Sequence, residues 1–496
     1  MNLLLLLDMA AAGRGDEVAV ESGGERLTAA ELLASAWTGA DLLAGASALA
    51  YVGTNGLAFP VGLFAAAAAG VPFVPLNYRL SEAQLHDMLV PLGDALVVAE
   101  GSVAGDLAAR GHRVVDAGAF VAAARAGTAT GDVPADGDAP AVLLHTSGTT
   151  AAPKAAVLRH RHLTSYVIGT VEFGGAGPDD AVLVSVPPYH VAGLANLLSN
   201  LYLGRRIVYL GQFTAADWVG AVRREAITHA MVVPTMLARI GEELEVDGAG
   251  LPSLRALSYG GARTPAPVLQ RVMALLPEVD LTNAYGLTET SSTIAVLGPD
   301  DHRAARDGDP RATGRLSSAG RVLPTVEVQV RGVGSEALPA GEAGEIWVRG
   351  EQVSGEYAGV PLGLDDEGWF PTRDRGWLDP DGYLFIEGRS DDTIIRGGEN
   401  IAPAEIEEVL LQHPDIEQCA VVGVPDDEWG QRVAAVVVTR PGAALDAAAV
   451  QDFARRTLRG AKTPDVVAFT AELPYTETGK LLRRVVQAGL VGGTVM

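Results

Sequence analysis

The chain has 496 residues, of which 48% are hydrophobic, so it is long enough for at least two domains that each bury a core. Its 37 Lys and Arg against 61 Asp and Glu give a formal net charge of -24, which argues against a broad nucleic-acid-binding surface. The one cysteine, Cys419, excludes an intrachain disulfide and is expected to be a small buried residue in a reducing compartment.

Two apolar stretches are candidates for export or membrane signals. Residues 1–13 are leucine-rich, but no basic region precedes the run and Asp8 interrupts it, so a signal peptide is not expected. Residues 58–76 contain three prolines and many alanines, which predicts a buried helix followed by a strand and no membrane span. We therefore expect a cytoplasmic protein.

Short apolar strands and helices alternate along the first part of the chain. Residues 27–45 have helical spacing with Thr28 as the cap, and short apolar runs typical of buried parallel strands occur at 48–53, 141–145 and 180–187. This alternation predicts an α/β fold.

Two polar segments rich in Gly and Pro, 123–140 and 298–320, are aperiodic and are expected to be exposed loops. After about residue 390 the elements become short. They are a helix at 403–413, strands at 419–425 and 432–440, and a helix at 446–460. This part is expected to form a separate small α+β domain.

A pattern that suits phosphate follows the strand at 141–145. The run HTSGTTAAPKAA at 145–156 combines hydroxyls, backbone N–H groups of a tight turn and a mobile positive charge, from Thr146, Ser147, Gly148, Thr149, Thr150 and Lys154. It is not the GxxxxGK[ST] loop, because the second glycine before the lysine is missing and the hydroxyl residues precede the lysine. An ordinary surface turn can have this composition, so a phosphate site needs support from other motifs.

Two further motifs suit the rest of a nucleotide. TNAYGLTET at 282–290 brings an aromatic ring, a hydroxyl and a carboxylate together in Tyr285, Thr288 and Glu289, which suit a base, a phosphate and a magnesium ion. Asp374 and Arg389 have the groups that bind the oxygens of a ribose.

Two glycine-containing turns lie in the C-terminal part. RGGENIAPAEIE at 396–407 places Gly397 and Gly398 before a helix, and TETGKLLRR at 476–484 places Lys480 on a turn near the end of the chain. A solvated basic tail would look similar to the second motif.

Together and in this order, the five motifs resemble those of the adenylate-forming superfamily of acyl- and aryl-CoA synthetases, nonribosomal peptide adenylation domains and luciferases. The resemblance covers essentially the whole chain and is nearest to stand-alone acyl- or aryl-CoA synthetases. It implies an α/β fold with a large N-terminal domain of layered βα sheets plus a small barrel-like part, and a small mobile α+β C-terminal domain. The implied boundaries are 1–389 and 390–496, with a hinge near Asp391.

The resemblance also implies a two-step reaction. A carboxylate attacks the α-phosphate of ATP to give an acyl-adenylate and pyrophosphate, and a thiol then takes the acyl group and releases AMP. ATP and CoA would be co-substrates, and Mg²⁺ the cofactor. Both steps need charge compensation more than covalent catalysis.

The resemblance assigns a role to each motif residue. Residues 146–150 with Lys154 would hold the β- and γ-phosphates, Thr288 the α-phosphate, and Glu289 the magnesium. Gly261, Ala262 and Arg263 would line the adenine beside Tyr285, whereas Asp374 and Arg389 would bind the ribose. Lys480 would bridge the carboxylate and the α-phosphate, and the Gly397–Gly398 turn would replace it after a rotation of the C-terminal domain.

The acyl side is less specific. Residues 185–204 resemble the substrate-pocket segment of the family, with His190 beside the carboxylate and the thiol path, although a histidine packed in a core would fit too. The segment has no Asp or Glu to hold an α-ammonium, which disfavours an amino acid as substrate. Its apolar side chains predict a hydrophobic carboxylic acid, passed to CoA or to a separate carrier protein. The sequence leaves the oligomeric state open.

Three positions depart from the usual family pattern, which has glycine at each: Ala151, Ala155 and Arg373. If these positions need a positive φ, a side chain costs roughly 1 kcal/mol at each. The first hypothesis is a working synthetase with a slower ATP loop. The alternatives are an enzyme weak in adenylation that mainly forms the thioester, and a non-catalytic nucleotide- or acyl-binding protein, which the retained Lys480 disfavours.

Overall fold

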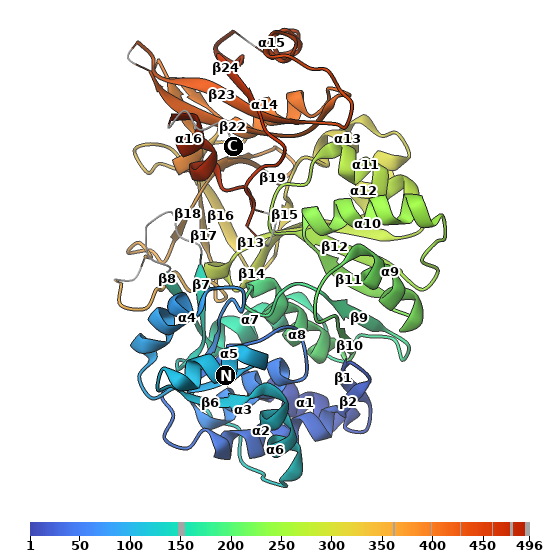
Figure 1. Cartoon of the computed structure of the whole chain (residues 1–496), viewed down its shortest axis with the longest axis vertical. Coiled ribbons are helices and arrows are strands. Elements are labelled where there is room, and N and C mark those ends of the chain that lie inside the picture. Colours follow the sequence, from blue (N-terminus) through green and yellow to red (C-terminus); the bar gives the residue numbers. More distant parts are fainter. Residues whose placement is uncertain are drawn as a thin grey trace.

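The computed structural model describes residues 1–146, 154–360, 363–397, 399–426, 428–458, 460–476 and 480–491. The molecule is elongated. Figure 1 shows the N-terminal helices at one end of the long axis, the middle of the chain at the centre and the C-terminal strands at the other end. In the described part of the chain, no helix is long and apolar enough to cross a membrane.

A six-stranded sheet forms the N-terminal end, in the order β6-β5-β3-β4-β7-β8. Its strands are β3 (Leu49–Val52), β4 (Phe73–Pro75), β5 (Leu96–Ala99), β6 (Arg113–Asp116), β7 (Pro140–Thr146) and β8 (Lys154–Arg159). Only β7 and β8 pair antiparallel among these neighbours. Helix α3 (Ala58–Ala69) is buried from Ala58 to Ala67 and leads into β4, so the predicted buried helix and strand are confirmed.

A thirteen-stranded sheet occupies the centre. Its first half contains β1 (Val18–Ser22), β2 (Glu25–Thr28), β9 (Ala181–Val184), β10 (Arg206–Tyr209), β11 (His229–Val232), β12 (Ala256–Gly260) and β13 (Asp280–Leu287). Its antiparallel half contains β14 (Ser292–Leu297), β15 (Gly320–Val322), β16 (Glu327–Arg331), β17 (Gly344–Arg349), β18 (Phe370–Leu378) and β19 (Tyr383–Arg389). The antiparallel half has its own core around Ile346, Val348 and Phe370, where a barrel-like part was expected.

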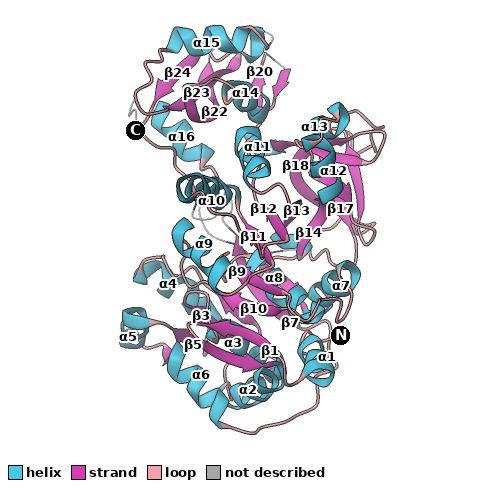
Figure 2. Cartoon of the chain, turned by 90° about the vertical axis from the view of Figure 1, so that its right-hand side faces the viewer, coloured by secondary structure: helices cyan, strands magenta, loops and turns pink. Residues whose placement is uncertain are grey.

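Helices cover these two sheets. The remaining N-terminal helices are α1 (Leu4–Arg14), α2 (Ala29–Leu42), α4 (Glu82–Leu89), α5 (Gly101–Ala109), α6 (Ala117–Ala126), α7 (His160–Thr170), α8 (Val191–Leu203), α9 (Ala215–Arg224), α10 (Pro234–Asp247) and α11 (Ala266–Leu275), with 3-10 turns η1 (Val90–Leu92) and η2 (Thr288–Thr290). The Thr28 side chain caps α2, as predicted, and the structure adds a reciprocal hydrogen bond from Thr28 N to the Glu31 carboxylate. Figure 2 shows α9 to α11 against the central strands.

The C-terminal part contains η3 (Ser390–Asp392), β20 (Ile394–Arg396), β21 (Glu399–Ile401), α14 (Pro403–Leu410), β22 (Ile416–Asp426), β23 (Gly430–Thr439), α15 (Ala447–Arg455), η4 (Gly460–Lys462), β24 (Val466–Phe469) and α16 (Arg483–Val491). Alternate residues of β22 and β23 enter two hydrophobic clusters, both built from residues beyond 393. Cys419 is buried in one of them, as predicted, and burial raises its pKa. This part therefore buries its own core, and the expected division into a large N-terminal and a smaller C-terminal part is confirmed.

Two expected loops are partly helical. Residues 298–320 contain α12 (Pro299–Arg306) and α13 (Pro310–Arg315), each with proline near its start, and the Asp309 side chain caps α13. The buried His302 accounts for the ordering of α12, because its Nε2 lies 2.8 Å from the Tyr259 hydroxyl. The segment 123–140 begins inside α6. In 298–320, capping and one buried contact outweigh a polar, aperiodic composition, whereas residues 127–139 form no helix or strand, as expected.

Candidate active site

Three predicted nucleotide residues contact one another where β13, β18 and β19 meet. Asp374 and Arg389 are cross-strand partners, and Arg389 Nε lies 2.9 Å from Asp374 Oδ1. The Tyr285 hydroxyl donates a hydrogen bond to the other Asp374 oxygen. Burial raises the pKa of the Asp374 carboxyl, and the adjacent Arg389 charge opposes that rise. A carboxylate beside a fixed guanidinium suits the two hydroxyls of a ribose.

A second cluster surrounds Glu289, which lies in η2 and is 8% exposed. The Tyr357 hydroxyl donates a hydrogen bond to Glu289 Oε1. The Lys154 ammonium lies 5.8 Å from the centroid of the same tyrosine ring, within the range of a cation–π contact. Arg389 pairs with Asp374, which leaves Glu289 without a cationic partner within ion-pair distance in the described ranges.

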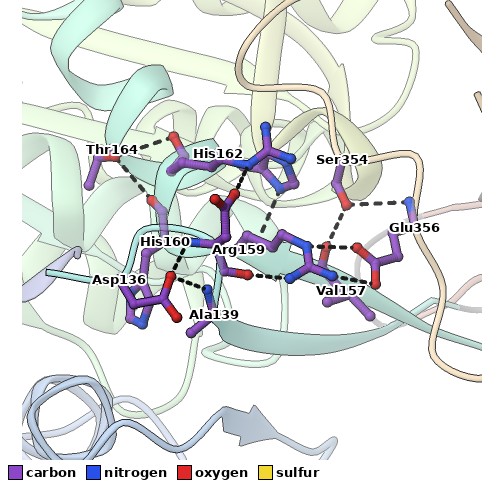
Figure 3. A network of polar contacts seen from close by, with 11 residues as sticks. Asp136, Ala139, Val157, Arg159, His160, His162, Thr164, Ser354 and Glu356 are labelled. Carbon is purple, nitrogen blue, oxygen red and sulfur yellow. Dashed lines mark hydrogen bonds and ion pairs between the residues drawn. The ribbon is translucent and has the colours of Figure 1, made fainter. Parts of the chain in front are cut away.

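The segment that carries Tyr357 is fixed to β8 on both sides of the tyrosine. Val157 N donates to the Glu356 carbonyl at 2.9 Å, and Ala358 N donates to the Ala155 carbonyl at 2.8 Å. Figure 3 shows the side chains behind this pairing: the Arg159 guanidinium donates two hydrogen bonds to the Glu356 carboxylate, at 2.8 and 2.9 Å. The strand that begins with Lys154 therefore also determines where Tyr357 lies.

Lys480 lies on a turn of the C-terminal part. Its backbone N donates to Thr476 Oγ1 at 2.9 Å, and Thr476 N donates to the Lys480 carbonyl at 2.7 Å, which closes a turn. Lys480 is an exposed residue, and partial desolvation and the charge of Arg389 lower the pKa of its ammonium, whereas Asp374 and Glu289 act in the opposite direction. The carboxylates of the N-terminal part therefore act electrostatically on this lysine of the C-terminal part.

The segment after β12 contains the residues that are expected to line the adenine, and one of its glycines has a backbone conformation that favours glycine. Gly261 has a φ of +85°, a conformation that favours glycine. The Arg263 side chain instead forms an ion pair with Glu408 of α14. A place beside adenine thus stays a prediction for Gly261, Ala262 and the Arg263 backbone, since the Arg263 guanidinium has another partner.

His190 is the N-cap of α8, where its Nδ1 accepts a hydrogen bond from Ala192 N at 3.4 Å. Burial lowers its pKa to about 4, so the imidazole is neutral at pH 7. A neutral ring at this helix start can border a carboxylate path without adding charge. Its role at the carboxylate and the thiol path stays a prediction.

Some of the remaining predicted residues lie within the described ranges and others lie outside them. Thr146 ends β7 and its hydroxyl donates to the Lys154 carbonyl at 3.4 Å, and Thr288 begins η2. Gly397 has a φ of +57° and its N donates to the Trp429 carbonyl at 2.9 Å. The predictions for Ser147, Gly148, Thr149, Thr150, Ala151 and Gly398 lie outside the described residues.

The suspected backbone strain is found at one of the two described positions. Arg373 has a φ of +60°, in the left-handed region that disfavours residues with a Cβ. Ala155 lies within β8, paired with His145, and has no positive φ. The condition for backbone strain, a positive φ, is therefore not met at position 155, because a strand accepts a side chain there.

Comparison with known proteins identifies this arrangement. The family model of the AMP-binding enzymes matches residues 7–358, and the model of the AMP-binding enzyme C-terminal domain matches residues 405–480. The chain belongs to the AMP-binding enzyme family. The adenylate-forming resemblance of the motifs is thereby confirmed.

Named relatives of this AMP-binding enzyme are ligases. It is 35% identical over 478 residues to a feruloyl-CoA synthase from an Amycolatopsis species, with 94% of each chain covered. It is 33% identical over 456 residues to a fatty acid–acyl-carrier-protein ligase from Streptomyces coeruleorubidus, with 89% and 86% covered. The fold matches o-succinylbenzoate CoA synthetase from Bacillus subtilis in complex with its acyl-adenylate intermediate, at a TM-score of 0.84, 27% identity and 97% coverage of both chains. The expected class, an AMP-forming acyl-CoA synthetase, is confirmed.

The Glu289 carboxylate is a suitable protein ligand for a magnesium ion. Mg²⁺ in nucleotide enzymes takes one or two protein carboxylates and completes its shell with phosphate oxygens and water. Glu289 is a buried carboxylate without a cationic partner, and in the described ranges no group of three or more ligating side chains forms a closed metal cage. One open carboxylate fits an ion that arrives with ATP.

Sequence reasoning missed Tyr357 and Glu408. Tyr357 follows an aperiodic polar stretch, and its two partners, Lys154 and Glu289, are distant in the sequence. Glu408 lies on a helix whose exposed acidic residues look alike in sequence. Neither position has a spacing signal, because both act through pairings that only the folded chain creates.

Proposed function

We propose that this AMP-binding enzyme activates a hydrophobic carboxylic acid as its acyl-adenylate and transfers the acyl group to CoA. The observation that carries the proposal is the contact of Tyr285, Asp374 and Arg389 in one cluster, together with the electrostatic influence of Asp374 and Glu289 on Lys480 of the C-terminal part. A lysine there can offset negative charge as a carboxylate oxygen bonds to the α-phosphate and pyrophosphate leaves. No protein nucleophile is needed for this step.

Each cluster takes one part of the nucleotide in this proposal. Asp374 and Arg389 bind the ribose hydroxyls, and Tyr285 borders the base on the side of Gly261. Thr288, at the start of η2, meets the α-phosphate, whereas Lys154 and residues 146–150 meet the β- and γ-phosphates. Magnesium, held by Glu289 when bound with ATP, would neutralise charge on the leaving pyrophosphate.

The acyl group would lie between α8 and three inner strands. Met231, Ser258 and Thr282 are register partners on β11, β12 and β13, and all three are partly exposed. Asn196 of α8 faces this row, with its Nδ2 3.3 Å from the Met231 sulfur. Partial exposure on inner strands beside a helix supports open space there, bordered by the Met231 thioether and by polar side chains.

The second step would follow a rotation of the C-terminal part, residues 390–496, about a hinge near Asp391. The RGG turn at Gly397 would then replace Lys480 at the adenylate. We propose CoA as the thiol and a cytoplasmic location. A separate carrier protein is the second candidate acceptor, favoured by the relative that charges an acyl carrier protein.

The test is a panel of aliphatic, alicyclic and aryl carboxylic acids, each assayed for ATP–pyrophosphate exchange without thiol and for AMP release with CoA. Exchange with at least one acid, followed by CoA-dependent thioester, is the expected result. Thioester formation only from a supplied acyl-adenylate would favour an enzyme weak in its own adenylation. No exchange and no thioester, in a folded protein that binds ATP, would contradict the proposal and leave a nucleotide-binding protein.

A further inference from the structure

Tyr357 is a side chain of the nucleotide site for which the motifs give no role. Its hydroxyl donates to Glu289 Oε1, and its ring lies 5.8 Å from the Lys154 ammonium. We propose that Tyr357 is a positioning residue that aims the Glu289 carboxylate at the magnesium of Mg·ATP while its ring holds Lys154 toward the outer phosphates. This inference rests on the proposed function.

Backbone hydrogen bonds on both sides fix the position of Tyr357. Tyr357 and Ala156 form an isolated antiparallel bridge between the segment and β8. Ser354 N donates to the Glu289 carbonyl at 2.8 Å, and Gln352 Nε2 donates to the Thr290 and Thr293 carbonyls at 3.0 and 2.8 Å. The segment is thus tied to β8 on one side and to η2 on the other, and Tyr357 spans the two.

This geometry gives the two halves of the side chain different tasks. A hydrogen bond from a phenol engages Oε1 of a carboxylate that is 8% exposed, which leaves Oε2 for a metal. A carboxylate that rotates freely would have to be ordered each time the metal binds, at a cost in affinity. The ring contact with Lys154 does not need the hydroxyl, because the ammonium interacts with the ring face.

Two variants separate these tasks. Tyr357→Phe keeps the ring and removes the hydroxyl, so the Mg²⁺ concentration that supports half-maximal ATP binding should rise by roughly tenfold, the scale of one hydrogen bond to a charged group. ATP affinity in EDTA should stay within about twofold of wild type. Tyr357→Leu removes both contacts and should weaken ATP binding in EDTA as well. Isothermal titration calorimetry measures all of these without turnover.

A matched control exists in the same chain. The Tyr383 hydroxyl donates to Asp301 Oδ1 at 2.8 Å, away from the nucleotide cluster, so Tyr383→Phe removes the same kind of bond and should leave the Mg²⁺ dependence unchanged. Glu289→Gln supplies a second test: the effect of Tyr357→Phe should largely disappear in that background, because the two residues act as one unit.

The outcomes are distinct. A Tyr357→Phe protein with wild-type Mg²⁺ dependence would overturn the proposal, as would an equal shift in Tyr383→Phe. If Tyr357→Phe does not fold, a Glu289→Gln protein with wild-type Mg²⁺ dependence would overturn the proposal instead. Failure of the wild-type protein to bind ATP would contradict the proposed function itself, which is a different result from an unaltered Mg²⁺ dependence.

Discussion

Arg263 and Glu408 form an ion pair that joins the N-terminal part to helix α14 of the C-terminal part. Both side chains are 41% exposed. The pair exists in the arrangement in which Asp374 acts electrostatically on Lys480, so a rotation of the C-terminal part that carries Lys480 away would separate the two charges. An exposed pair is worth about 1 kcal/mol at most, which corresponds to roughly a fivefold change in the population of one orientation.

We expect Glu408→Gln to lower the rate of pyrophosphate exchange two- to fivefold and to leave thioester formation from supplied acyl-adenylate unchanged or faster. The difference should shrink in 0.5 M salt, because salt screens exposed charges. Glu405 of the same helix is the matched control: it pairs with Lys462 inside the C-terminal part, so Glu405→Gln should change neither step. Equal effects of the two variants would show that the Arg263 pair does not select an orientation.

Lys480→Ala should separate the two half-reactions more strongly. Loss of a preorganised charge at the reacting atoms costs on the order of 100-fold, so pyrophosphate exchange should fall by at least ~100-fold. CoA transfer from supplied adenylate should remain nearly intact, since the proposed orientation for that step moves Lys480 away. Arg484→Ala, which removes an exposed cation on α16, is the control and should retain both activities. Similar losses in both steps would contradict this division of labour.

A proline in η3 tests the hinge. Asp391→Pro fixes φ near -65° and restricts the preceding Ser390, so it should hold the C-terminal part in one orientation. Pyrophosphate exchange should persist and CoA-dependent thioester formation should be lost. Asp391→Ala keeps a free backbone and should support both steps at wild-type rates. CoA-dependent turnover of the proline variant at wild-type rates would place the hinge elsewhere or make rotation unnecessary.

How far the sequence predicted the molecule depends on the range of the interaction. Features that depend on residues close together in the sequence were predicted correctly. Thr28 caps α2, and the apolar helix α3 is buried. The motif residues Tyr285, Asp374 and Arg389 do come together: the register of β18 and β19 sets the Asp374–Arg389 ion pair, and Tyr285 reaches Asp374 from β13. The helix α12 was missed because its order depends on His302 meeting Tyr259. Tyr357 and the Arg263–Glu408 pair were missed for the same reason.

The last prediction compares two substitutions that both restore the family's usual glycine. Arg373 has a φ of +60°, so Arg373→Gly should relieve strain and raise the free energy of unfolding by about 0.5–1 kcal/mol, after the greater freedom of glycine in the unfolded chain is subtracted. Ala155 lies in β8, so Ala155→Gly should lower that free energy by about 0.5–1 kcal/mol and should not speed adenylation. Urea unfolding midpoints of the two variants measure the signs. Arg373→Asn is the control for the lost charge, because asparagine tolerates the left-handed conformation and should also stabilise relative to arginine. If both glycine variants move the midpoint in the same direction, backbone conformation is not what distinguishes these positions.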